Sequence, residues 1–327
     1  MKGLAITAEH LKNQQDVVKS EVRVNVLNRP YGGFPWLWMP QVANTRWENA
    51  HNFYGDLADI DAATLADAKT FFDTYYRPGN AAIAIVGDFE PEQALGWAKK
   101  YLGAVPAGAV PQKPDVSEPR QEAERRSVRV DSLAQRPALA FAYHTPPPET
   151  PDYFALLLAH QLLASGRDSA LSLALVQQRG FTDAVDGEVH ALGTPFNVEG
   201  PETWTVSLRH DVKTSADTIL AVAEEEIAKL RDAKVSLEQL ERAKTKARSD
   251  FYDLLESSNG FGKADLLAAY ALFYDQPERI NSIVSRYAAV TPEQLQKVAQ
   301  EYLRPQARTV LVLEAGAAAA AKAGGAK

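Results

Sequence analysis

Apolar and polar residues alternate with two different periods along this chain, and the two periods predict both strands and helices. Between residues 115 and 230, alternating apolar positions predict strands over "SVRVDSL", "ALAFAYHT" and "TWTVSLRH". Helical spacing of apolar residues predicts helices over "YFALLLAHQLLAS", "DSALSLALVQQRG" and "TSADTILAVAEEEIAKLRDA". The pattern therefore favours an α+β protein.

One stretch of the chain occurs twice. "TLADAKTFFDTYYRPGNAAIAIVGDFE" begins at Thr64, and "TPEQLQKVAQEYLRPQARTVLVLEAGA" begins at Thr291, so matching residues are 227 positions apart. Each copy is predicted to form a helix with a threonine N-cap, to stop at Arg-Pro and to continue as a half-buried strand. In the first copy the alternating apolar residues of this strand are Ile83, Ile85 and Phe89.

A weaker match lies upstream of each copy. "TAEHLKNQQDVVKSE" from Thr7 resembles "SLEQLERAKTKARSD" from Ser236 at an offset of 229, which pairs Glu21 with Asp250. The strands and helices of residues 115–230 precede the second copy, and nothing comparable precedes the first. If the two domains are built alike, the first is truncated at its N-terminus and the chain is a fragment or a processed piece. The alternative is that helix–strand units resemble each other by chance.

These observations predict four regions. Residues 1–106 are expected to be the C-terminal half of a first domain, and 107–126 a proline-rich, extended, exposed linker. Residues 127–315 are expected to form a complete second domain. The Ala/Gly-rich tail, 316–327, is expected to be disordered.

Composition and charge narrow the class of protein. The 327 residues carry a formal net charge of −7, so no positive field gathers nucleic acid. The chain has no cysteine, which excludes disulfides, thiolate zinc sites and a cysteine nucleophile. No apolar run is long enough for a membrane span. We therefore expect neither a nucleic-acid partner nor a membrane span.

One acidic residue interrupts a valine-rich helical stripe. In "NQQDVVKSEVRVNVLNRPYG", residues 13–32, Glu21 lies at helical spacing from Val17 and Val24 and would face inward with them. An inward carboxylate is costly unless it is paired or binds a metal. Taken alone, a glutamate on a lysine-containing helix is more often a solvated residue.

Together with "DLADIDAATLADAKTFFDTYYRPGNAAIAIVGDF", this stretch resembles the insulinase and pitrilysin type of zinc peptidase, the inverted zincins that include mitochondrial processing peptidase. The resemblance covers residues 1 to about 315. It implies two homologous α+β domains, each an antiparallel sheet covered by helices. It also implies that an H-x-x-E-H helix supplies two histidine ligands and a general base, and that a downstream helix supplies the third zinc ligand at the position of Glu21.

The sequence departs from this pattern in its histidines. The six are His10, His51, His144, His160, His190 and His210, and no two have H-x-x-E-H spacing. No catalytic residue is therefore assigned, the metal site is expected to be incomplete, and the chain alone is expected to be inert. Zinc is expected in the intact parent and not on this chain.

The second domain carries a counterpart of the motif helix without its chemistry. In "LLLAHQLLASG", His160 stands at the second histidine position, and Leu156 and Ala159 stand at those of the first histidine and the glutamate. We expect His160 to be a core or boundary residue. The Arg/Tyr pair that assists catalysis in the family falls on Val176 and Asp183, so neither residue matches.

A further family carboxylate falls on Gln14, which leaves no acidic residue there. The aromatic stretch "YGGFPWLWMPQ" from Tyr31 fits loop aromatics that pack on the domain better than a substrate-contacting loop. A serine-hydrolase reading of "SGRDS" at Ser165 is weak, because G-x-S-x-G is absent.

Two functions remain open. The first is part of a zinc endopeptidase that hydrolyses peptides or small proteins through a zinc-activated water. The second is a non-catalytic, chamber-forming or scaffold subunit of the same fold. The resemblance implies a peptide substrate, a homologous half or subunit that closes a clam-shell chamber, possible homo-oligomers, and a periplasmic or secreted parent.

Overall fold

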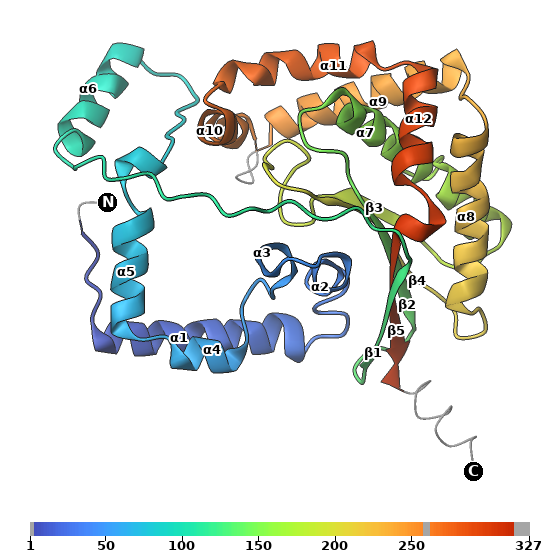
Figure 1. Cartoon of the computed structure of the whole chain (residues 1–327), viewed down its shortest axis with the longest axis horizontal. Helices are drawn as coiled ribbons and strands as arrows, with labels where there is room; N and C mark the ends of the chain where they lie inside the picture. The colour runs from blue at the N-terminus through green and yellow to red at the C-terminus, as the bar shows by residue number, and fades with distance from the viewer. Residues whose placement is uncertain (1–2, 258–261, 317–327) are drawn as a thin grey trace.

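The computed structural model describes residues 3–257 and 262–316, and its centre is a five-stranded sheet (Figure 1). The strands are β1 (Arg125–Asp131), β2 (Ala138–His144), β3 (Asp186–Val189), β4 (Thr203–Arg209) and β5 (Arg308–Ala315), in the spatial order β1-β5-β2-β4-β3. All neighbours are antiparallel except β1 and β5, which are parallel. The sheet is thus mixed rather than purely antiparallel, and the chain between β1 and β5, which includes β2, β3, β4 and the helices, is long enough to allow their parallel pairing.

The predicted elements of the second domain are confirmed. β1, β2 and β4 lie on the three predicted strands, and α7 (Pro151–Leu163) and α8 (Ala216–Asp232) lie on two of the predicted helices. The third predicted helix is a π-helix, η3 (Ser172–Gln178). The α+β class predicted from hydrophobic spacing is therefore correct.

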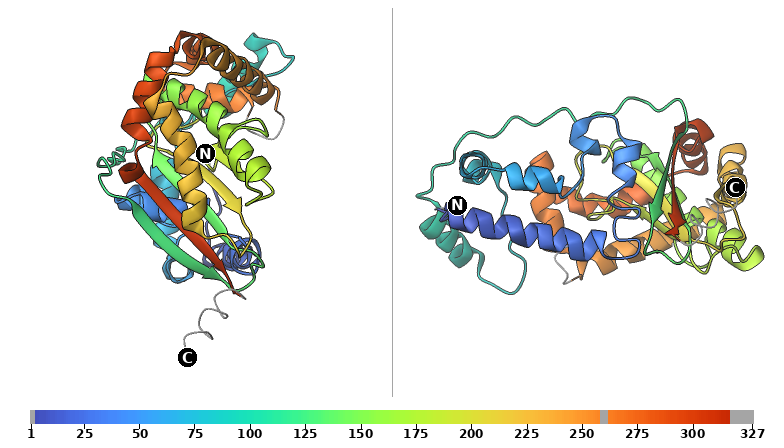
Figure 2. Two further views of the ribbon diagram at one scale, coloured as in Figure 1. Left: turned by 90° about the vertical axis from the view of Figure 1, so that its right-hand side faces the viewer. Right: turned by 90° about the horizontal axis from the view of Figure 1, so that it is seen from below.

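A layer of helices covers one face of the sheet (Figures 1 and 2). Besides α7 and α8, it contains α9 (Leu237–Leu255), α10 (Lys263–Tyr274), η4 (Pro277–Ser282), α11 (Ile283–Ala289), α12 (Pro292–Tyr302) and η5 (Pro305–Ala307). α7 packs against α9 and α12, and α12 also packs against α8. The main core lies between this layer and the sheet, where Phe141, Val206 and Val310 are buried.

The opposite face of the sheet is covered by residues that precede it in the chain. The segment around α2 (Met39–Ala43), followed by α3 (Trp47–Ala50), places Met39 with Phe34 and Trp38 against Ala140 and Leu311. The aromatic stretch from Tyr31 therefore packs on the domain, as expected. Since both faces are covered, β2 is almost continuously buried.

The remaining helices extend away from the sheet (Figure 1). They are α1 (Ala8–Val22), continued by the π-helix η1 (Arg23–Leu27), then α4 (Leu57–Ala62), α5 (Leu65–Tyr75), the turn η2 (Pro78–Asn80) and α6 (Pro91–Leu102). α1 is fixed to α4 because Gln15 donates through Nε2 to the carbonyls of Ile60 and Ala63, at 2.7 and 3.0 Å. Lys19 also pairs with Asp61 at 2.5 Å.

The two copies of the repeat fold alike over their helices. Thr64 and Thr291 both cap an eleven-residue helix by accepting a backbone hydrogen bond, from Asp67 and Gln294. Both helices end before Arg-Pro, and a short 3₁₀ turn follows each. The capping and stop signals therefore predicted these helices correctly.

The strand predicted over residues 81–89 is wrong for the described chain. The second copy forms β5 between β1 and β2, whereas residues 81–89 pair with no strand among residues 3–257 and 262–316. A strand needs a neighbour to satisfy its backbone groups, and the described residues offer none here. For the same reason, residues 3–106 contain no sheet within the part that the structure describes.

The apolar residues of the first copy are correspondingly exposed. Phe71 and Ile83 are 57% and 63% exposed, whereas their counterparts at the offset of 227, Val298 and Val310, are both fully buried. Ile85 is 53% exposed, and its counterpart Val312 only 9%. One copy thus buries an apolar face that the other leaves open.

The proline-rich connection is extended but is more firmly held than its composition predicts. Glu118 accepts hydrogen bonds from the backbone amides of Thr45 and Arg46 and from the side chain of Asn49. Gln121 is buried and donates to the carbonyl of Arg308 at the start of β5.

The limits of the four predicted regions stay a prediction, and residues 317–327 of the predicted tail lie outside the described residues.

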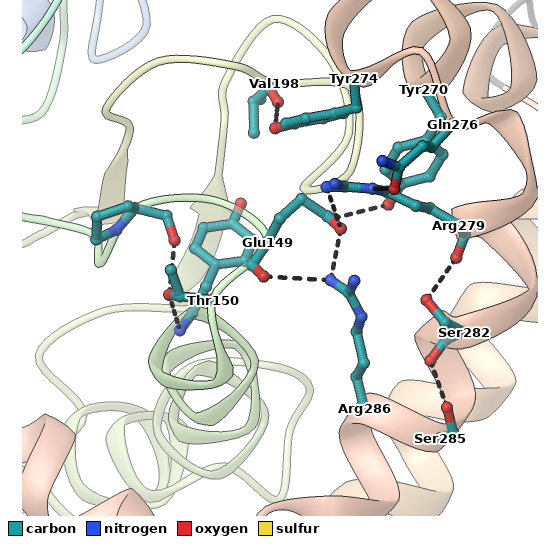
Figure 3. A network of polar contacts seen from close by, with 12 residues as sticks. Glu149, Thr150, Val198, Tyr270, Tyr274, Gln276, Arg279, Ser282, Ser285 and Arg286 are labelled. Atoms are coloured by element: carbon teal, nitrogen blue, oxygen red, sulfur yellow. Dashed lines mark hydrogen bonds and ion pairs between the residues drawn. The ribbon is translucent and has the colours of Figure 1, made fainter.

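A polar network holds the start of α7 against α10 and α11 (Figure 3). Glu149, with a positive φ of 65°, pairs with Arg286 at 2.5 Å and Arg279 at 3.6 Å. The hydroxyl of Tyr270 donates to the same carboxylate at 3.0 Å. The Glu149 side chain is only 10% exposed, so these partners take the place of water as its hydrogen-bond donors.

In the described part of the chain, no helix has the length and apolar character that crossing a bilayer requires.

Candidate functional site

Glu21 lies in the last turn of α1, on the exposed side of that helix. Val22 and Val26 face the body of the chain and are buried, whereas Val17 and Val24 are 49% and 63% exposed. Glu21 shares the exposed side with the latter two. The inward orientation that the valine spacing indicated is therefore wrong for the described chain, because the face that packs against Leu37 and Trp38 contains Val22 and Val26.

The nearest polar partner of Glu21 is Tyr54. Its hydroxyl donates to Oε1 of Glu21 over 3.2 Å. Partial burial, together with the Glu21 carboxylate, raises the pKa of Tyr54, so the phenol stays protonated and can donate this hydrogen bond. Sequence reasoning missed Tyr54 because it stands 33 residues from Glu21 and belongs to no motif.

The second copy of the repeat shows what the acid corresponding to Glu21 contacts. Asp250, the counterpart of Glu21, lies on α9 and accepts a hydrogen bond from Nε2 of Gln161 at 2.8 Å. Gln161 lies on α7, directly after His160. The acidic position of the downstream helix therefore faces the helix that corresponds to H-x-x-E-H.

His160 is held in the packed part of the second domain. The indole N–H of Trp204 donates to its Nδ1 at 3.2 Å, which leaves the ring proton on Nε2. Burial, with a smaller effect of Lys246, lowers the pKa of His160 to about 4. Leu156 and Ala159, at the other motif positions, are buried in the core. His160 thus stays neutral as a structural residue.

This environment predicts a loss of stability in acid. The pKa of His160 is about 4 in the folded chain and about 6.5 when unfolded, so its contribution is complete above pH 6.5 and falls between pH 6.5 and 4. We expect His160→Asn to remove about 1–3 kcal/mol of this pH dependence, measured by urea unfolding across that range. His10→Asn, an exposed control, should leave the profile unchanged; equal profiles for wild type and His160→Asn would contradict the assignment.

The other family positions carry no catalytic arrangement. Val176 lies in η3, and Asp183 is exposed and pairs with Arg136 at 2.5 Å. Gln14 is exposed on α1. The structure does not bring these residues together with Glu21.

The residues that are present do not fit a complete zinc site. A catalytic zinc takes three protein ligands. Within residues 3–257 and 262–316, no group of three or more histidine, cysteine, aspartate or glutamate side chains is arranged to hold a metal ion. Glu21 can offer one carboxylate, and its hydrogen-bond partner is a phenol.

Comparison with known proteins decides the family. The profile described as the peptidase M16 inactive domain matches residues 62–247, more than half of the chain. The chain belongs to the M16 peptidase family. This confirms the resemblance to insulinase-type peptidases, and it agrees with the absence of H-x-x-E-H from the sequence.

Individual relatives extend the match over nearly the whole chain. A curated zinc protease, PqqE of Helicobacter pylori, is 24% identical over 331 residues, which cover 96% of this chain and 69% of the relative. The crystal structure of a protease from Helicobacter pylori has a TM-score of 0.82 at 22% identity, covering 96% of this chain and 74% of that one.

A third comparison is with a structure that contains only the first half of a protease. The crystal structure of the first half of the periplasmic protease PqqL from Escherichia coli has a TM-score of 0.70 at 16% identity, covering 97% of this chain and 68% of that one. At these identities the two solved structures establish the fold of the chain and nothing finer.

Proposed function

We propose that this chain is the part of a zinc-dependent endopeptidase that supplies the third zinc ligand, Glu21, together with a complete non-catalytic second domain. Two histidines and a general base would come from a complementary half-domain that carries H-x-x-E-H. Its substrates would be peptides or small proteins. The site-bearing face of α1 would then lie between this chain and the complementary half-domain.

The contact between Asp250 and Gln161 carries the proposal. It places the acid of the second copy against α7, the counterpart of the motif helix, at 2.8 Å. By the repeat, Glu21 on α1 would face the equivalent helix of the first domain. That side of α1 is exposed in the described chain, where Val17 and Val24 flank Glu21. An exposed apolar stripe around one acid fits a missing partner better than a solvated helix surface.

The exposed face of the first copy supports the same partner. Its helix α5 corresponds to α12, which packs on α7 and α8, and residues 81–89 correspond to β5, which pairs with β1 and β2. A half-domain with equivalents of two strands and two helices would bury Phe71, Ile83 and Ile85 as the second copy buries their counterparts.

The zinc dependence, peptide substrate and compartment are carried over from relatives. PqqE of Helicobacter pylori is named a zinc protease, and PqqL of Escherichia coli a periplasmic protease. We propose a periplasmic parent on this basis.

Reconstitution tests the proposal. The chain would be mixed with a separately expressed polypeptide carrying H-x-x-E-H, taken from sequence encoded upstream of or next to this reading frame. We expect a one-to-one complex that binds one zinc ion and cleaves a quenched fluorescent peptide, while each part alone is inactive. A stable complex that holds no zinc would contradict the peptidase function and favour a scaffold subunit.

A further inference from the structure

A second region of the molecule is built to receive a ligand. A cavity of about 1000 Å³ lies between the extended connection, the end of β2 and the turn after α12. Its walls include five prolines and two aromatic residues, Pro114, Pro119, Pro147, Pro148, Pro201, Phe273 and Tyr302. Proline rings have no N–H to donate, so these walls are largely apolar. Such walls with a few fixed polar groups are typical of binding sites.

His144 supplies one fixed polar group. Nδ2 of Asn44 donates to the carbonyl of Asn49 at 3.0 Å, which orients the Asn44 amide and turns its Oδ1 toward Nε2 of His144 at 2.9 Å. Nε2 must therefore carry the ring proton, and Nδ1 is left as an acceptor. Burial lowers the pKa of His144, which keeps the ring neutral. In the described part of the chain, Nδ1 has no hydrogen-bond partner.

Thr145 supplies the second group. The residue is 6% exposed and lines the cavity, and its backbone N–H is fixed by the carbonyl of Glu202 at 2.8 Å. Its hydroxyl has no hydrogen-bond partner among residues 3–257 and 262–316. A buried hydroxyl without a partner is destabilising, and side-chain packing alone does not require it. A ligand that accepts a hydrogen bond would satisfy it.

Most of the charged residues around the cavity are paired within the chain. Lys113 pairs with Glu199, and Glu202 pairs with His190 at 2.9 Å. The Glu118 carboxylate is occupied by its hydrogen bonds to the α2–α3 loop. Asp115 pairs with Arg46, and Arg120 and Arg304 both pair with Glu122. Most charged groups of the lining are thus paired within the chain, and the Glu301 carboxylate disfavours an anionic ligand, so the apolar walls and the two unpartnered polar groups determine what fits.

We propose that this cavity binds an uncharged, apolar segment of a peptide chain. A peptide N–H donates to Nδ1 of His144, the Thr145 hydroxyl donates to a peptide carbonyl, and apolar side chains pack on the proline and aromatic rings. A peptide backbone carries both a donor and an acceptor at each residue, which matches the two unpartnered groups. The peptide nature of the ligand rests on the proposed function.

Peptide binding to the chain alone tests this site. The probes are dye-labelled, end-capped Gly/Ser decapeptides with a central Phe-Leu-Phe, Lys-Lys-Lys or Asp-Asp-Asp, followed by fluorescence anisotropy. We expect the Phe-Leu-Phe peptide to bind at least about 10-fold more tightly than either charged peptide. Thr145→Val should weaken it about 3- to 10-fold, since one hydrogen bond is lost. Ala307→Trp should weaken binding at least about 10-fold, because an indole ring in the lining would occupy part of the cavity.

The controls separate binding from folding. Thr145→Val replaces an unpartnered hydroxyl with a methyl group, so its melting temperature should equal or exceed that of wild type. Thr214→Val, on the loop before α8, should bind like wild type. Equal binding by wild type, Thr145→Val and Ala307→Trp would overturn the proposal, as would equal binding of the charged peptides. The reconstitution experiment of the proposed function depends on α1, α5 and residues 81–89 and not on this cavity. A failure to form an active complex would therefore be distinguishable from a failure of the cavity to bind peptide.

Discussion

Glu21→Gln is expected to lower the zinc affinity of the reconstituted assembly by at least about 100-fold, and peptide hydrolysis with it. Removing even an outer partner of a metal ligand typically costs 10–100-fold in affinity, so loss of a direct ligand should cost at least as much. Glutamine keeps the size of Glu21 but removes the negative charge that a zinc ligand provides. Zinc would be measured by competition with a chromophoric chelator, and hydrolysis with the quenched peptide.

Two comparisons make this result specific to Glu21. Glu9→Gln changes an exposed glutamate in the first turn of the same helix, and it should leave zinc affinity and activity close to wild type. Tyr54→Phe removes the hydroxyl that contacts Glu21 and should have a smaller effect than Glu21→Gln. Full activity of the Glu21→Gln assembly would show that Glu21 is not a zinc ligand.

Glu149→Ala is expected to destabilise the second domain by about 2–4 kcal/mol. The substitution leaves Arg279 and Arg286 without their shared carboxylate and removes the acceptor of the Tyr270 hydroxyl (Figure 3). Breaking one partner of a buried pair typically costs 3–5 kcal/mol, and the two arginines here are partly exposed, which reduces the cost. The measurement is urea unfolding followed by circular dichroism.

An exposed ion pair provides the control for this prediction. Asp73 on α5 pairs with Arg77, which lies just beyond the end of that helix, and the Asp73 side chain is 68% exposed. Asp73→Ala should therefore change stability by less than about 0.5 kcal/mol. If Glu149→Ala had an effect as small as Asp73→Ala, the network would not be holding α7 against α10 and α11.

Sequence patterns predicted the second domain well because its elements have partners to pack against. Its strands and helices pack against each other, so apolar spacing along β2 and α12 corresponds to burial in the core. Capping signals such as Thr64 and Thr291 are local, so both predicted the start of a helix correctly in spite of their different surroundings. The parallel pairing of β1 with β5 was missed because it depends on contacts between distant segments.

In the first copy of the repeat, the spacing of apolar residues does not predict the structure correctly. Residues 81–89 carry the alternation of a strand, but alternation forms no strand without a neighbour to pair with. Valine spacing around Glu21 likewise indicated an apolar face without specifying what covers it. Tyr54 and His144 could not be found from sequence, because their roles depend on contacts with Glu21 and Asn44 that the fold creates.

We expect the open face of the first copy to be covered by a complementary half-domain in the assembled enzyme. Hydrogen–deuterium exchange of residues 81–89 and α5 tests it most directly, measured for the chain alone and after addition of the H-x-x-E-H polypeptide. We predict fast exchange over residues 81–89 in the chain alone and strong protection in the complex, approaching that of β5, because new strand hydrogen bonds form. Unchanged fast exchange over residues 81–89 in a saturated mixture would show that no half-domain covers this face.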